Sequence, residues 1–151
     1  MKALILAVGV LFSAASLASS LTTGDRIEAI TLADQHQAVW ELNSNTQILL
    51  FSRGMKGGEI IQEALESLEG PMPGNWRYVA DISGMPSLIA KFVAIPKMQD
   101  LNFAIGLDQE GEATHLLPGD KETATVITLE GLKVVKVVSV DSAKALLEAV
   151  K

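Results

Sequence analysis

Cysteine is absent from all 151 residues of this chain. A chain without thiols forms no disulfide bonds and offers neither a thiolate nucleophile nor a thiolate metal ligand. Thiol oxidoreductase and thiol peroxidase activities are therefore not expected, and the stability of the fold has to come from apolar packing. Apolar residue types make up 48% of the sequence, which is sufficient for one hydrophobic core.

Positive charge is also scarce. The chain has 12 Lys and Arg against 18 Asp and Glu, a net charge of −6. No basic cluster offsets phosphate charge, which argues against nucleic acids and anionic lipid surfaces as partners. The two histidines, His36 and His115, lack the spacing of a metal site, and no glycine-rich nucleotide motif occurs. No cofactor or metal ion is therefore expected.

One long apolar run occurs, and it lies at the N-terminus. Lys2 precedes apolar residues 3–12, and small residues follow as far as Ser20. This layout is typical of a secretory signal peptide, and the run is too short for a spanning helix. We predict a signal peptide over residues 1–18, with cleavage after Ala18 or up to two residues later. Residues 19–151 are expected to form one soluble periplasmic domain without a stable membrane anchor.

The first half of this domain contains a predicted hairpin and a strand followed by a helix. Residues 25–32 and 38–42 alternate apolar and polar types around a turn that contains His36, which predicts an N-terminal β-hairpin. Residues 47–52 are almost continuously apolar, as in a central strand covered on both faces. A Gly-rich bend from Ser52 to Gly58 follows, and apolar residues at helical spacing predict a helix from about Gly58.

The second half again alternates strands and helices before it ends in β-structure. The predicted elements are a strand at 78–82, a helix after Pro86 that Pro96 ends, a hairpin of strands 103–107 and 112–117, paired strands 123–129 and 132–140, and a final helix capped by Asp141 or Ser142. Strands separated by helices favour parallel pairing and hairpins are antiparallel, so we predict a mixed sheet.

This order of elements resembles the thioredoxin-like superfamily in its peroxiredoxin-like form, over nearly all of residues 24–150. The segments that carry the resemblance are Gly24-Asp25, Thr31-Leu32-Ala33-Asp34, Leu49-Leu50-Phe51-Ser52 running into the Gly54 to Glu59 bend, and Thr125 to Gly131. The resemblance implies an α/β three-layer sandwich with a mixed central sheet and an N-terminal β-hairpin, as in small exported bacterial proteins.

The chain departs from this superfamily at the positions that carry redox chemistry. Alignment on Phe51 places Lys56 and Glu59 where the family has its two redox cysteines, and no cis-proline precedes the strand that starts at Thr123. A lysine amine or a carboxylate cannot take part in reversible disulfide exchange. The sequence therefore predicts a thioredoxin-like scaffold that lacks redox chemistry.

The bend before the first helix is the main candidate binding surface. A helix N-terminus attracts anions, and Arg53 and Lys56 lie beside it in the sequence. The candidate surface for a protein or a small anionic ligand comprises Arg53, Met55, Lys56, Gly57, Gly58 and Glu59. The simpler interpretation is that the glycines turn the chain and the charged side chains are solvated.

Two aspartates form a second candidate site. Asp81 and Asp108 fall near the ends of predicted strands, where open α/β sheets place their ligands. A non-thiol enzyme using Asp81, Asp108 or Lys56 is therefore the alternative to a binding module. Aspartates at strand ends are also common turn formers.

The helix between Met85 and Met98 is more apolar than one buried face requires, because Leu88, Ile89, Phe92, Val93 and Ile95 all lie within it. Methionine-edged apolar surfaces adapt to varied partners. The domain either buries both faces of this helix, which is the simpler interpretation, or leaves one face for a partner protein or a second copy of the chain. The function that we expect is a redox-inactive periplasmic module for binding or protein interaction.

Overall fold

The computed structural model describes residues 20–151, so the predicted signal peptide lies outside the described residues. The elements, in chain order, are β1 (Ile30–Ala33), β2 (Val39–Leu42), β3 (Ile48–Ser52), α1 (Met55–Glu66), β4 (Trp76–Asp81), α2 (Ser87–Ile89), the π-helix η1 (Ala90–Ala94), α3 (Ile95–Met98), β5 (Gly106–Asp108), β6 (Ala124–Glu130), β7 (Lys133–Val140) and α4 (Ala143–Ala149). Within the described residues, no helix is long and apolar enough to cross a membrane.

The central sheet has five strands in the order β5-β4-β3-β6-β7. β3 pairs in parallel with β4, and β4 pairs in parallel with β5, whereas β6 runs antiparallel to both β3 and β7. The sheet is therefore mixed, as the sequence predicts. All five residues of β3 are buried, which explains the continuous apolar run of this central strand.

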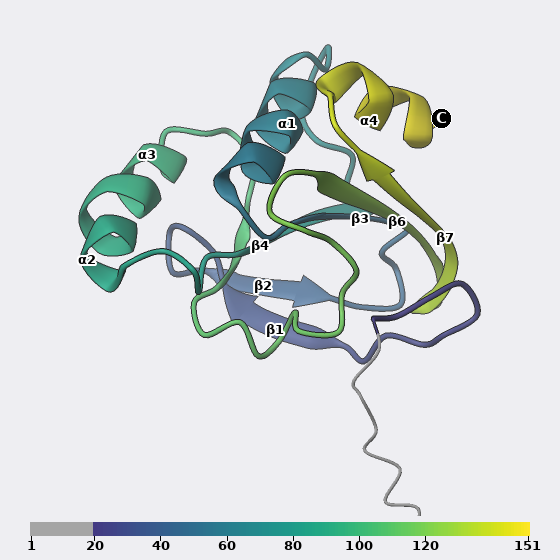
Figure 1. Cartoon of the computed structure of the whole chain (residues 1–151). Helices are drawn as coiled ribbons and strands as arrows, with labels where there is room; N and C mark the ends of the chain where they lie inside the picture. The colour runs from purple at the N-terminus through teal and green to yellow at the C-terminus, as the bar shows by residue number, and fades with distance from the viewer. Residues whose placement is uncertain (1–19) are drawn as a thin grey trace, which may run out of the picture.

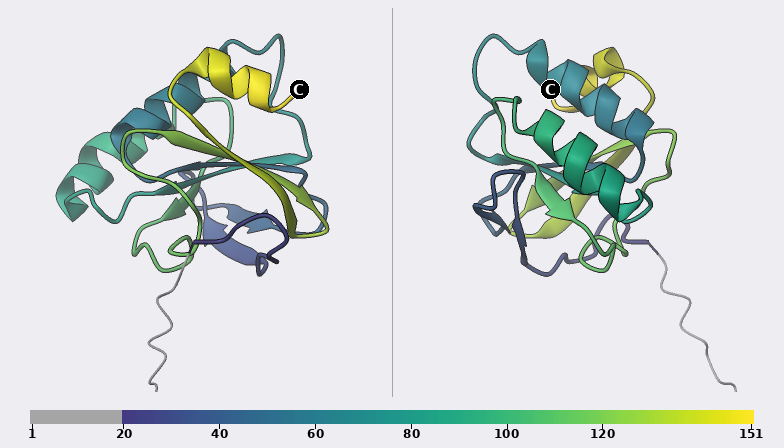
Figure 2. Two further views of the ribbon diagram at one scale, coloured as in Figure 1. Left: turned by 45° about the vertical axis from the view of Figure 1, so that its right-hand side comes forward. Right: turned by 90° about the vertical axis from the view of Figure 1, so that its left-hand side faces the viewer.

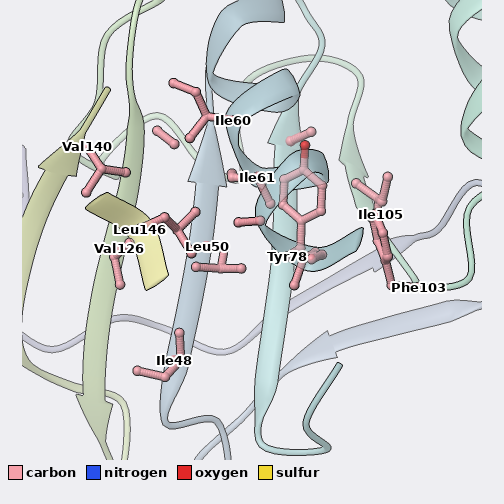
Figure 3. Close-up of a cluster of buried hydrophobic side chains, with 14 of the residues drawn as sticks. Ile48, Leu50, Ile60, Ile61, Tyr78, Phe103, Ile105, Val126, Val140 and Leu146 are labelled. Atoms are coloured by element: carbon pink, nitrogen blue, oxygen red, sulfur yellow. The ribbon is translucent and has the colours of Figure 1, made fainter. Parts of the chain in front are cut away.

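The molecule has three layers, with the helices on one face of the sheet and the β1-β2 hairpin on the other (Figure 1). The core under the helices includes Leu50 of β3, Ile61 of α1 and Leu146 of α4. Figure 3 shows these three side chains close together, with Tyr78 on β4 and Ile105, just before β5, beside them. A second core on the hairpin side includes Trp40, Phe51 and Ile127.

The predicted N-terminal hairpin is present but shorter than expected, because β1 begins at Ile30. Residues 24–27 instead run along the start of β7, where Ile27 is buried and Arg26 forms an isolated antiparallel bridge to Lys133. Gly24 makes this path possible with a φ of +97°. At the other end of the chain, Ser142 and not Asp141 caps α4, since its hydroxyl oxygen accepts a 3.1 Å bond from the Ala145 amide.

The predicted strand at 112–117 is wrong. This segment is a series of turns between β5 and β6, and β5 pairs with β4 instead of forming a hairpin. The buried carboxylate of Asp108 is the cause, because it accepts bonds from the Gly111 amide and from the amide and hydroxyl of Thr114. These bonds fold the chain back on itself directly after β5. His115, expected on a strand, therefore lies in this loop.

The prediction that Pro96 ends the helix after β4 is also wrong. Helical structure continues from Ser87 through Pro96 to Met98, with the π-helix η1 directly before the proline. In a regular α-helix the proline ring would meet the carbonyl four residues earlier. The wider turns of a π-helix change that spacing, which allows α2, η1 and α3 to form one continuous helical segment.

Candidate functional site

The Gly-rich bend starts the first helix earlier than the sequence suggests. Gly54 is the N-cap of α1, so Gly57 and Gly58 lie inside the first helical turns and not before the helix. Lys56 and Glu59 are exposed on these turns, and Met55 is 74% exposed. The two residues aligned with redox cysteines therefore occupy the start of α1 and face solvent.

Arg53 belongs to the framework of the protein. Its Nη1 donates to the carbonyl of Gly119 at 2.6 Å, and its Nη2 donates to the carbonyls of Thr114 and Leu117, each at 3.0 Å. Its Nε lies 3.5 Å from a carboxylate oxygen of Asp81. The guanidinium is only partly exposed, and its hydrogen bonds join the end of β3 to the loop between β5 and β6.

The glycines at this helix start allow close packing of two backbone segments. A Cβ on Gly57 would fall inside van der Waals contact with the carbonyl oxygen of Thr123, and a Cβ on Gly54 would lie 2.5 Å from the carbonyl oxygen of Lys121. The chain leading into β6 therefore covers this side of the helix N-terminus. A ligand could not approach the backbone at Gly54 and Gly57 from this side, because Lys121 and Thr123 occupy the space.

A buried polar pair lies beneath the first turns of α1. The hydroxyl oxygens of Ser52 and Tyr78 are 3.2 Å apart, and both side chains are buried. Burial raises the pKa of Tyr78 to about 12, and the bond to Ser52 offsets part of that rise. The phenol is therefore a neutral hydrogen-bonding group at physiological pH. The sequence contains one signal for this pair, a serine at the end of an apolar strand, but nothing in it that points to Tyr78 as the partner.

Asp81 and Asp108 both bond to nearby loop residues. One oxygen of Asp81 accepts from the amide and hydroxyl of Ser83, and the other faces Arg53. Asp108 is 3% exposed, and its oxygens hold the turn at Gly111 and Thr114. These contacts correspond to the turn-forming role that was the alternative to catalysis.

The described residues contain no group of three or more His, Asp or Glu side chains positioned to hold a metal ion. The surface has two open hollows. One, of about 280 Å³, lies between the end of α1 and residues 100–102. The other, of about 730 Å³, lies around the start of β3 and the end of β6. Neither hollow includes Arg53, Lys56, Asp81 or Asp108. The structure does bring Arg53 and Asp81 together, but neither side chain lines one of these two hollows.

The helical segment from Ser87 to Met98 exposes a contiguous apolar surface, so the prediction that the domain buries both of its faces is wrong. Its inner side packs on the core through buried Ala90 and the partly buried Ile95 and Met98, and Met85 packs there just before the segment begins. The outer side exposes 71% of Leu88, 47% of Ile89, 66% of Phe92 and 56% of Val93. We call these four residues the apolar helix face. Figure 2 shows this segment beside α1 at one side of the helical layer.

Gln35, in the turn between β1 and β2, forms hydrogen bonds at the C-terminal end of the Ser87 to Met98 segment and with the chain that follows it. Its side-chain nitrogen donates to the carbonyl of Phe103 at 2.7 Å, and its side-chain oxygen accepts from the amide of Ile105 at 2.8 Å. The side-chain nitrogen of Gln99, just after α3, donates to the carbonyl of Gln35 at 2.9 Å. Gln35 is 1% exposed, although its sequence context, Asp34-Gln35-His36-Gln37, indicated only a surface turn. The apolar helix face is therefore carried on a helix with an anchored C-terminal end.

Comparison with known proteins identifies the fold. No protein-family model matches the chain, and no curated protein matches it by sequence. Solved structures do match. One is a peroxiredoxin-like protein from Aquifex aeolicus, with 14% sequence identity and a TM-score of 0.57; the match covers 87% of this chain and 86% of that protein's chain. Another is the thioredoxin domain of a thiol-disulfide oxidoreductase from Bacteroides vulgatus, with 13% sequence identity and a TM-score of 0.54; the match covers 87% of this chain and 99% of that domain's chain.

These similarities show a shared thioredoxin-like fold, as the order of sequence elements predicted. At such low identity they concern the fold alone. The chain combines this fold with a sequence that contains no cysteine. The chain therefore shares the fold of these structures but lacks the residue type on which thiol chemistry depends.

Proposed function

We propose that this cysteine-free thioredoxin-like domain is exported to the periplasm and works there as a protein-binding module, with the apolar helix face as its binding surface. The export half of the proposal is supported by the sequence of residues 1–18, which has the layout of a signal peptide. The absence of cysteine supports a role that does not involve thiol exchange.

The observation that carries the proposal is the concentration of exposed apolar side chains on one short helix. Seven large apolar side chains of the described residues are substantially exposed, and four of them lie within the six residues from Leu88 to Val93. Single exposed apolar residues are normal, but contiguous apolar surface marks interaction sites. Full burial of such a side chain contributes about 1.5–3 kcal/mol, so a partner that covers this face gains substantial binding energy.

The Arg53 to Glu59 bend is the weaker candidate surface. The guanidinium of Arg53 is bonded to three loop carbonyls, and residues 121–123 cover the helix start at Gly54 and Gly57. Only Met55, Lys56 and Glu59 of the sequence-predicted surface remain exposed. An anionic ligand at this surface would meet the positive charge of Lys56 alone, with the negative charge of Glu59 close by in the same helical turn.

The proposal is tested by site-specific photocrosslinking followed by affinity measurement. A photoreactive amino acid is placed at Ile89, and separately at Glu59 on the bend, in the exported protein. Crosslinked proteins are identified by mass spectrometry and purified. The double variant Leu88→Ser/Phe92→Ser is then compared with the bend variant Lys56→Glu for binding to the purified partner.

We expect crosslinks from position 89 and an affinity at least tenfold lower for Leu88→Ser/Phe92→Ser, with Lys56→Glu within twofold of the unmodified protein. Both substitutions in the double variant are at exposed positions, so the fold is expected to remain intact, which circular dichroism checks. A partner that crosslinks only from position 59 and binds the double variant normally would overturn the assignment of the surface.

A further inference from the structure

The charges on the apolar helix face have the opposite sign to the charge of the chain. The chain as a whole is acidic, at −6, yet no Asp or Glu occurs between Asp81 and Asp100. The only charged side chains within residues 82–99 are Lys91 and Lys97, and both are exposed. The surface proposed to bind a partner is therefore apolar and cationic.

The two lysines lie on the same helical segment as the apolar helix face. Lys91 stands between Ile89 and Phe92 in the sequence, and Lys97 lies four positions after Val93. The Nζ atom of Lys91 lies 5.5 Å from the centroid of the Phe92 ring. Its positive charge is thus held at the edge of the apolar surface, at the distance of a cation–π contact.

From this arrangement we infer the chemistry of the partner, an inference that rests on the proposed function. The apolar helix face binds an amphipathic peptide segment of a protein, in which apolar side chains are flanked by Asp or Glu. The apolar side chains cover Leu88 and Phe92, and the carboxylates pair with Lys91 and Lys97. The segment from Leu88 to Lys97 is about 13 Å long at the α-helical rise, which corresponds to between two and three turns of a bound helix.

Charge complementarity favours this occupant over two others. A second copy of the chain, joined face to face, would bring four lysines into one interface without a carboxylate from residues 82–99 to pair with them. An anionic membrane would present an extended negative surface to a chain of net charge −6, whereas a short peptide brings only the few carboxylates that pair with the two lysines.

The test begins with a displayed library of random 12-residue peptides, selected on the full domain. Selected peptides are synthesised, and their affinities are measured for the unmodified protein, for Leu88→Ser/Phe92→Ser and for Lys91→Glu/Lys97→Glu. The matched charge control is Lys136→Glu/Lys144→Glu, which makes the same change of charge at exposed positions on β7 and α4. Light scattering and vesicles of phosphatidylglycerol with phosphatidylcholine are run in parallel.

We expect peptides that combine apolar residues at helical spacing with Asp or Glu. Their affinity should fall at least tenfold in Lys91→Glu/Lys97→Glu and in Leu88→Ser/Phe92→Ser, and by less than twofold in the control. Raising the salt concentration should weaken binding to the unmodified protein more than to the charge-reversed variant.

Other results separate this inference from the proposed function. Peptides that need Leu88 and Phe92 but bind the charge-reversed variant equally well would overturn the acidic partner and leave a protein-binding face. Peptides indifferent to Leu88→Ser/Phe92→Ser, or no selected peptide, would overturn both. Vesicle binding or dimer formation that is lost in Leu88→Ser/Phe92→Ser, without peptide binding, would assign the face to a membrane or to a second copy.

Discussion

The hydroxyl groups of Ser52 and Tyr78 meet at 3.2 Å under the first turns of α1, where β3 and β4 lie side by side. Figure 3 shows the ring of Tyr78 between Ile61 of α1 and Ile105, with its oxygen at the far end of the ring. The pair places a buried neutral hydrogen bond directly below the helix start that carries Lys56. Its consequences can be measured because Tyr78 is the only tyrosine of the chain.

Tyr78 should ionise at unusually high pH. Burial raises its pKa from 10.0 to about 12. The unfolded chain ionises near the ordinary value, so the stability linked to Tyr78 is fully present below pH 10 and is lost as the pH rises from 10 to about 12. Tyrosinate absorbance should therefore titrate near pH 12 in the folded protein and near pH 10 in urea.

Tyr78→Phe is the matched control for this titration. It removes the linked ionisation but keeps the ring, and lysine deprotonation affects both proteins equally. The free energy of unfolding in urea should decline more steeply above pH 10 for the unmodified protein, by up to about 1.4 kcal/mol per pH unit. Parallel pH profiles of the two proteins would contradict the buried neutral phenol.

Gly57 and Gly58 should respond in opposite directions to alanine. A methyl group at Gly57 would meet the backbone of Thr123, whereas one at Gly58 would lie at ordinary contact distance, 3.5 Å from the Tyr78 hydroxyl. We expect Gly57→Ala to lower the free energy of unfolding by about 2 kcal/mol. Gly58→Ala should be neutral or raise it by about 0.5 kcal/mol, because alanine favours helix. Chemical denaturation measures both, and equal effects would refute the close packing at Gly57.

Removing the guanidinium of Arg53 should release the loop between β5 and β6. Arg53→Ala leaves three carbonyls without their donor, and we expect a loss of about 3 kcal/mol of unfolding free energy. Amide hydrogen exchange in residues 109–123 should accelerate more than exchange in β3 or β4. Lys56→Ala, at an exposed position of the same helix start, should change neither quantity. An unaltered loop in Arg53→Ala would show that these bonds do not hold it.

The carboxylate of Asp108 should also stabilise the loop between β5 and β6, because it accepts hydrogen bonds from Gly111 and Thr114. Asp108→Asn retains the size of the side chain but turns one acceptor oxygen into a donor, opposite the amide or hydroxyl donors of Gly111 and Thr114. We expect the free energy of unfolding to fall by about 2 kcal/mol, because the site is buried. Glu110→Gln, exposed in the same loop, is the control and should have little effect. Equal stability of the two variants would contradict a structural role for Asp108.

The candidate site could be predicted only in part, and the reasons are specific. The sequence placed Arg53 beside the helix N-terminus, but the carbonyls that engage it come from residues 114–119, more than 60 positions away. Gly57 packs against the backbone of Thr123, a residue 66 positions away in the sequence. Periodicity carries no information about such distant partners.

The sequence by itself determined the fold class, the mixed sheet and the absence of thiol chemistry. Those properties follow from features that are visible in the sequence itself: the apolar run from Ile48 to Phe51, the helical spacing of apolar residues in α1, and the lack of cysteine. Only the tertiary structure decided which apolar residues of the Met85 to Met98 segment stay exposed. An apolar helix has the same sequence pattern whether one or both faces are covered, and the outcome depends on which elements the folded sheet brings against it.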